Sequence, residues 1–108
     1  MSQKNLAIDD EGTRAYKGSK KVALLRALLL KVLSKASEGH FVLKENGTII
    51  AEVGSPSADL QAEADVLDQR AYERALLGGN TAAGEAYVDG WWTSPDITQV
   101  TRFFSRNL

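Results

Sequence analysis

The stretch that decides the fold is residues 40–53, HFVLKENGTIIAEV. Two runs rich in β-branched and aromatic residues flank Asn46-Gly47, a dipeptide that favours the tight two-residue turn of a β-hairpin. We therefore expect strands at residues 40–45 and 48–53. A hairpin alone is marginally stable, so the segments on either side of it must supply its core.

A helix is predicted before the hairpin, at residues 19–37, with Ser19 as its capping residue. One stripe of this helix has the spacing of a buried face and consists of Val22, Leu25, Leu29, Val32 and Leu33. Three further leucines lie off that stripe, at Leu24, Leu28 and Leu30. The helix is therefore apolar over more of its circumference than one packing face requires.

After the hairpin, residues 60–68 alternate apolar and polar residues, which predicts a third strand with one wet face. A helix stays open as the alternative there, because alanine and glutamate favour helices. Asp68 is then expected to cap a helix that ends at Gly78-Gly79.

The last third of the chain is expected to contain a short helix at residues 81–90, an extended piece at Trp91-Trp92 and a final helix capped by Ser94. The order predicts an α+β fold, with a small antiparallel sheet (the hairpin plus one or two further strands) packed with helices. Residues 1–18 are expected to be a loose polar leader, and residues 19–108 a single domain.

Bulk composition excludes several classes of protein. A length of 108 residues fits one domain, and a net charge of −1 gives no global reason to expect a nucleic-acid partner. The absence of cysteine excludes a disulfide scaffold and suits a reducing compartment such as the cytoplasm. No apolar run is long enough to cross a membrane, and we expect no signal peptide.

The positive charge is concentrated near the start. Residues 12–37 hold seven basic residues and no acidic one: Arg14, Lys17, Lys20, Lys21, Arg26, Lys31 and Lys35. A basic helix with a wide apolar coat is typical of a helix that lies on an anionic membrane. On that interpretation the lipid contacts are Leu24 and Leu28, and the headgroup contacts are Lys17, Lys20, Lys21, Arg26, Lys31 and Lys35. The alternative is a central core helix whose lysines merely reach water.

Catalytic chemistry is hard to find in the sequence. His40 is the one histidine, so a catalytic triad would have to use it, and a zinc site would need three carboxylates besides it. Residues 79–85, GNTAAGE, have the glycine spacing of a phosphate-binding loop, but Glu85 stands where that loop needs lysine. Glu85 and Asp89 lie four residues apart, and we interpret them as structural polar groups rather than an acid–base pair.

Aromatic residues gather in the later part of the chain and include the adjacent pair Trp91-Trp92. In a strand, consecutive side chains point to opposite faces. One tryptophan can therefore belong to the core, while the other needs a groove, a partner domain or lipid. A core of this size is not expected to hold an apolar pocket unless a partner completes it.

Residues 84–92, GEAYVDGWW, resemble the signature G-E-A/S-Y-M-D-G-W-W of cyclopropane-fatty-acyl-phospholipid synthases, which are S-adenosylmethionine-dependent methyltransferases. Val88 stands where methionine is common. The matching positions are Gly84, Glu85, Ala86, Tyr87, Asp89, Gly90, Trp91 and Trp92. The resemblance extends over residues 66–104, and it implies a fold similar to sterol-carrier-protein-type lipid-binding domains.

The family's catalytic and cofactor residues lie in a downstream methyltransferase domain that this chain does not contain. The resemblance thus implies a non-catalytic N-terminal accessory domain, with no catalytic, cofactor-binding or metal residue of its own. S-adenosylmethionine would belong to the absent domain. The expected partners are that methyltransferase domain, an anionic phospholipid membrane, or a second copy of the chain.

Under this hypothesis the domain is cytoplasmic, peripheral to the inner face of the membrane, and it positions the catalytic domain there. Its lipid or partner contacts would be Trp91, Trp92, Tyr87, Leu24 and Leu28. The alternative is a purely structural interaction or dimerisation module without lipid contact. A free-standing lipid carrier is the weakest interpretation, because it needs an apolar cavity.

Overall fold

The computed structural model describes residues 16–107 and contains three helices and four strands. In chain order they are α1 (Tyr16–Ser34), β1 (His40–Glu45), β2 (Thr48–Gly54), β3 (Gln61–Val66), α2 (Arg70–Val88), β4 (Trp92–Thr93) and α3 (Ile97–Asn107). The α+β class predicted from the sequence is confirmed. Within the described residues, no helix is both long and apolar enough to cross a membrane.

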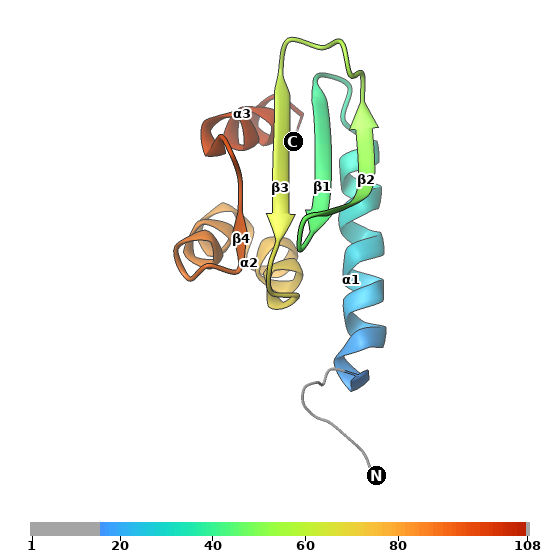
Figure 1. The fold of residues 1–108 in the computed structure, drawn as a ribbon, viewed down its shortest axis with the longest axis vertical. Coiled ribbons are helices and arrows are strands. Elements are labelled where there is room, and N and C mark those ends of the chain that lie inside the picture. The colour runs from blue at the N-terminus through green and yellow to red at the C-terminus, as the bar shows by residue number, and fades with distance from the viewer. Residues whose placement is uncertain (1–15, 108) are drawn as a thin grey trace.

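The predicted hairpin is formed by β1 and β2 (Figure 1). Asn46 and Gly47 at its tip have φ angles of 47° and 85°, the two positive values that a tight hairpin turn needs. The pairing shifts register between Leu43 and Lys44. The Asn-Gly signal therefore located the hairpin correctly.

The sheet has the order β2-β1-β3-β4 and is mixed rather than antiparallel throughout. β3 pairs parallel with β1, and β4 pairs antiparallel with β3 (Figure 1). The expectation of an antiparallel sheet was wrong because β2 ends beside the start of β1, and the loop after β2 crosses to the other side of β1 at that same end of the sheet. There the backbone N–H of His40 donates to the carbonyl of Leu60 at 2.8 Å. β3 consequently runs in the same direction as β1.

Several predicted boundaries change in the structure. α1 begins at Tyr16, so Ser19 lies inside the helix instead of capping it, and residues 16–18 belong to the domain. The rest of the predicted leader lies outside the described residues. At α3, the cap is Asp96, whose carboxylate accepts the backbone N–H of Thr98 at 3.1 Å; the Ser94 hydroxyl accepts the N–H of Asp96 instead.

α2 is two helical pieces joined at a sharp break. Gly79 has φ 72° and ψ −161°, which no helix accommodates. The pieces 70–78 and 80–88 correspond to the two helices expected from the sequence, separated at the predicted glycine pair. Gln69 occupies the N-terminal cap position of α2 and makes no side-chain cap hydrogen bond. The predicted capping residue, Asp68, lies one residue earlier, and its carboxylate accepts the backbone N–H of Arg70 at 2.9 Å.

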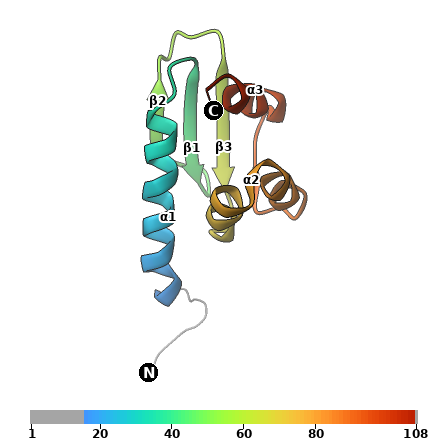
Figure 2. The ribbon, with the colours of Figure 1, turned by 180° about the vertical axis from the view of Figure 1, so that it is seen from behind.

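All three helices cover one face of the sheet, as Figures 1 and 2 show from opposite sides. The core between them and the sheet is built around Phe41 of β1 and Phe103 of α3, whose ring centroids are 5.0 Å apart. Asn107 fastens α3 to the loop before β1. Its side chain accepts the backbone N–H groups of Ser37 and Glu38, each at 2.9 Å, and donates to the carbonyls of Glu38 and Phe103.

Candidate functional site

The exposed side of α1 carries a stripe of lysines and leucines, which we call the lysine–leucine stripe: Lys20, Leu24, Leu28, Lys31 and Lys35. These positions recur every three or four residues and so lie on one face of the helix. All five are exposed, including 61% of Leu24 and 45% of Leu28. Two large apolar side chains thus stand in solvent among three cations.

The two remaining candidate cations with described side chains lie differently. Lys21 donates to Glu73 of α2 at 3.0 Å beside the stripe, and both side chains are largely solvated. Arg26 points instead toward the sheet, where its guanidinium holds Glu45 by two hydrogen bonds of 2.7 and 3.2 Å. Arg26 is therefore separated from the lysine–leucine stripe. The side chain of Lys17 lies outside the described part of the structure.

Glu45 joins three elements, because it also accepts a hydrogen bond from the Tyr72 hydroxyl of α2. Burial, and then the hydrogen bond to Glu45, raise the pKa of Tyr72, so its phenol stays neutral. The same carboxylate raises the pKa of Arg26. The cluster carries one positive and one negative charge, and it connects α1, β1 and α2.

The signature residues 84–92 form the end of α2, a turn and β4. Ala86 is fully buried, and its carbonyl accepts the backbone N–H of Trp91 at 2.9 Å. Gly90 adopts φ 81° in the turn, a conformation that favours glycine after a helix. Glu85 is largely solvated, 3.9 Å from Arg74, and Asp89 is exposed. The structural role expected for the two acids therefore stays a prediction.

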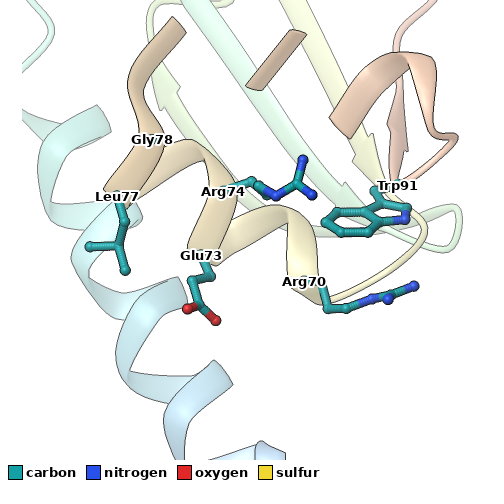
Figure 3. A pocket seen from close by; sticks show the side chains of 6 residues that line it. All are labelled: Arg70, Glu73, Arg74, Leu77, Gly78 and Trp91. Carbon is teal, nitrogen blue, oxygen red and sulfur yellow. The ribbon is translucent and has the colours of Figure 1, made fainter. Parts of the chain in front are cut away.

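Trp91 lies in a shallow groove between two arginines (Figure 3). The guanidinium carbons of Arg70 and Arg74 are 4.2 and 4.5 Å from the indole ring centroid. Arg70 also holds Asp68 through its guanidinium, with a closest contact of 2.6 Å, and this hydrogen bonding lowers the pKa of Asp68. Trp91 is thus covered by cations and half-buried.

Trp92 lies in a different environment, although Trp91 precedes β4 and the two are not consecutive residues of one strand as expected. Its indole N–H donates to the carbonyl of Ala83 at 2.8 Å, and its ring meets Tyr87 edge to face at 5.1 Å. The rest of the ring lines a large cavity between the helices and the sheet. Trp92 is half-buried too, so neither tryptophan is wholly enclosed.

The cavity has a volume of about 800 Å³, within the range of roughly 300–1,000 Å³ for small-molecule sites. Its floor and walls come from the sheet and all three helices: Leu29, Val32 and Leu33 of α1; Phe41, Leu43, Ala64 and Val66 of the sheet; Ala71, Tyr72, Ala75, Leu76, Gly79, Asn80, Ala83 and Gly84 of α2; Trp92 of β4; and Ile97, Val100, Thr101, Phe104 and Ser105 of α3. None of these side chains is charged.

This cavity was not expected from the sequence. If it were dry and sealed, it would cost about 19 kcal/mol at ~24 cal/mol per Å³, more than the whole stability of a typical domain. The space is therefore in contact with solvent or a ligand rather than a packing defect. Its exposed lining residues, Gly79, Asn80 and Gly84 of α2 with Ile97, Thr101 and Ser105 of α3, mark the open side. The available sequence signal was the run of small residues at 79–84.

The single histidine links three strands of the sheet. His40 is buried, and its ring nitrogens lie 2.7 Å from Oε1 of Gln61 and 2.9 Å from Oε2 of Glu52. These bonds connect β1 with both neighbouring strands. Across the described residues, no three histidine, aspartate or glutamate side chains cluster as metal ligands.

Comparison of the chain with models of protein families, with curated proteins and with solved structures finds no match.

Proposed function

We propose that this chain is a non-catalytic accessory domain of a cyclopropane-fatty-acyl-phospholipid-synthase-like methyltransferase, which engages an anionic phospholipid membrane and positions the catalytic domain there. The membrane part of the proposal rests on the lysine–leucine stripe of α1. The family part rests on residues 84–92, whose sequence resembles the family signature.

The stripe has the two components of a membrane-surface helix. Leu24 and Leu28 can enter the boundary between headgroups and acyl chains, while Lys20, Lys31 and Lys35 stay in the headgroup layer. Each lysine near an anionic surface contributes ~1 kcal/mol. α1 contains no acidic residue that would oppose this attraction.

Vesicle co-sedimentation at low salt tests the membrane contact, with phosphatidylglycerol–phosphatidylcholine vesicles. The paired substitution Lys31→Gln/Lys35→Gln removes two of these cations and should weaken binding about 30-fold. Arg102→Gln/Arg106→Gln changes the net charge equally on α3 and serves as the matched control. Equal loss in both variants would mean that only net charge matters, and would remove the role of α1.

A second pair of variants tests the apolar part of the stripe. Leu24→Ser/Leu28→Ser should abolish most of the binding that survives at high salt, because this residual binding is hydrophobic. Ile49→Ser is the control, since Ile49 is 56% exposed on β2. If wild-type protein does not sediment with the anionic vesicles, the membrane proposal is wrong.

The alternative is an interaction module that docks on the methyltransferase domain or on a second copy, without lipid contact. It is favoured by the Trp91 groove, because tryptophan and arginine are enriched at the energetic centres of interfaces. A blue shift of tryptophan emission that needs rising protein concentration or the partner domain, and is unchanged by vesicles, would support this alternative.

A further inference from the structure

We infer that the cavity between the helices and the sheet binds a single acyl chain of a phospholipid, with the polar headgroup left outside at the open side. This inference rests on the proposed lipid-binding function and adds to it a specific site inside the domain. The lysine–leucine stripe concerns the bilayer surface, whereas the cavity would accommodate one chain of one lipid.

The lining supports a hydrocarbon occupant because it offers no charge and little unused hydrogen bonding. The Trp92 indole N–H is already bonded to Ala83, and the Tyr72 hydroxyl to Glu45. The hydroxyls of Thr101 and Ser105 donate to carbonyls of their own helix, at 3.1 and 3.2 Å. A peptide or a nucleotide inside this space would leave its own polar groups unpaired, which is costly.

The open side suits the other end of the lipid. Asn80 is exposed and follows the break at Gly79, and its side chain makes no hydrogen bond to any other residue that the structure describes. A carboxamide can donate to an ester carbonyl. Leu33 and Phe41, which also line the cavity, are buried and form its apolar floor. Hydrocarbon at the floor and ester at Asn80 is the orientation that matches this polarity.

Brominated lipid tests the inference directly, because bromine quenches indole fluorescence only at close range. The probe is 9,10-dibromostearoyl lysophosphatidylcholine below its micelle concentration, whose zwitterionic headgroup gives the lysines no net charge to attract. Trp91→Phe leaves Trp92 in the cavity and should be quenched with saturation. Trp92→Phe leaves Trp91 in its groove outside the cavity and should not be quenched.

Filling the cavity with a larger side chain tests the inference independently, through the affinity for the lipid. Gly84 lines the cavity and an added Cβ there would meet no atom within 4 Å, so Gly84→Leu introduces a larger side chain at the cavity wall from an open position. Each methylene of the acyl chain that the leucine side chain excludes from the cavity weakens binding about fourfold, so the affinity for the lipid should fall roughly tenfold or more. Thr81→Leu is the control, because it lies exposed on the same helical piece and does not line the cavity. Circular dichroism verifies that both variants fold.

The outcomes separate this inference from the proposed function. Equal quenching of both tryptophan variants, or none, would overturn the acyl site even if the chain still binds anionic vesicles. Saturable quenching of Trp92 without vesicle binding would support the site and refute the membrane contact. Stronger quenching by free 9,10-dibromostearic acid would assign the cavity to fatty acid and overturn the choice of phospholipid. Quenching of Trp92 that weakens as the protein concentration rises would indicate that a second copy of the chain occupies the cavity.

Discussion

Replacing Tyr72 with phenylalanine removes one hydroxyl from the point where α1, β1 and α2 meet. The ring, which is 1% exposed, keeps its volume, so no cavity is created. Glu45 remains bonded to Arg26, so no charge is orphaned. The change therefore isolates the hydrogen bond between the Tyr72 hydroxyl and the Glu45 carboxylate. Hydrogen bonds to charged groups contribute about 1.5–3 kcal/mol, and the free energy of unfolding should fall by that amount at pH 7.

The same hydroxyl determines how stability depends on alkaline pH. The fold raises the pKa of Tyr72 above its ordinary value of 10.0. The stabilisation that this raised pKa provides is complete below pH 10.0. It is lost as the pH rises toward the pKa of Tyr72 in the folded state, because the unfolded chain releases the proton first. Wild-type stability should fall above pH 10 by up to ~1.4 kcal/mol per pH unit from this group alone. Tyr72→Phe lacks this contribution, so the two proteins should converge in stability.

Urea unfolding followed by circular dichroism at pH 7, 9, 10 and 11 measures both effects. Tyr87→Phe is the control, since the Tyr87 hydroxyl has no hydrogen-bond partner among the described residues, and it should change stability by less than ~0.5 kcal/mol. A Tyr72→Phe protein as stable as wild type at pH 7, or a stability difference that stays constant up to pH 11, would refute the assigned role of the hydroxyl.

Two further substitutions test the turns and caps. Asp68→Asn should destabilise the protein at neutral pH, because Arg70 lowers the pKa of Asp68 and the ionised carboxylate therefore stabilises the fold. The difference in stability should shrink as the pH falls below 3.8 and the carboxylate protonates. Acid titration of the two proteins by circular dichroism measures this difference, and a constant difference down to pH 2 would contradict the prediction. Gly54→Ala should lower the free energy of unfolding by more than the ~1–3 kcal/mol of a strained backbone residue, since Gly54 has φ 86° and an added Cβ would lie 2.0 Å from the carbonyl oxygen of Gly39. Thermal unfolding measures this loss of stability. Gly47→Ala is the control, because a Cβ there meets no atom and the variant isolates the cost of positive φ alone.

Local signals in the sequence predicted local structure well. Asn46-Gly47 located the hairpin, and the break at Gly79 divides α2 where the glycine pair predicted. These features depend on φ preferences of one or two residues, which the sequence displays directly. The α1 start at Tyr16 was missed, because a serine can cap a helix only if the chain before it is not helical.

Pairings between distant segments were not predictable in the same way. Whether β3 runs parallel to β1 depends on the path of the loop at residues 55–60, not on alternation within the strand. Arg26 was grouped with the lysines because its partner Glu45 is remote in sequence. The cavity was missed for a related reason: a space is defined by the placement of three helices, and Ala83 and Gly84 alone indicate only that little fills it.

The hydrogen bonds by which Asn107 fastens α3 to the loop before β1 affect how the chain folds during its synthesis. Its side chain joins the last turn of α3 to Ser37 and Glu38, 70 and 69 residues earlier, and Phe103 completes the core beside it. A nascent chain on the ribosome would therefore expose Phe41 and its neighbours until α3 emerged from the exit tunnel. During that interval the hairpin would lack the part of its cover that α3 supplies, a state prone to association. Substitutions in α3 should consequently lower the yield of folded protein in the cell more than their effect on the free energy of unfolding suggests.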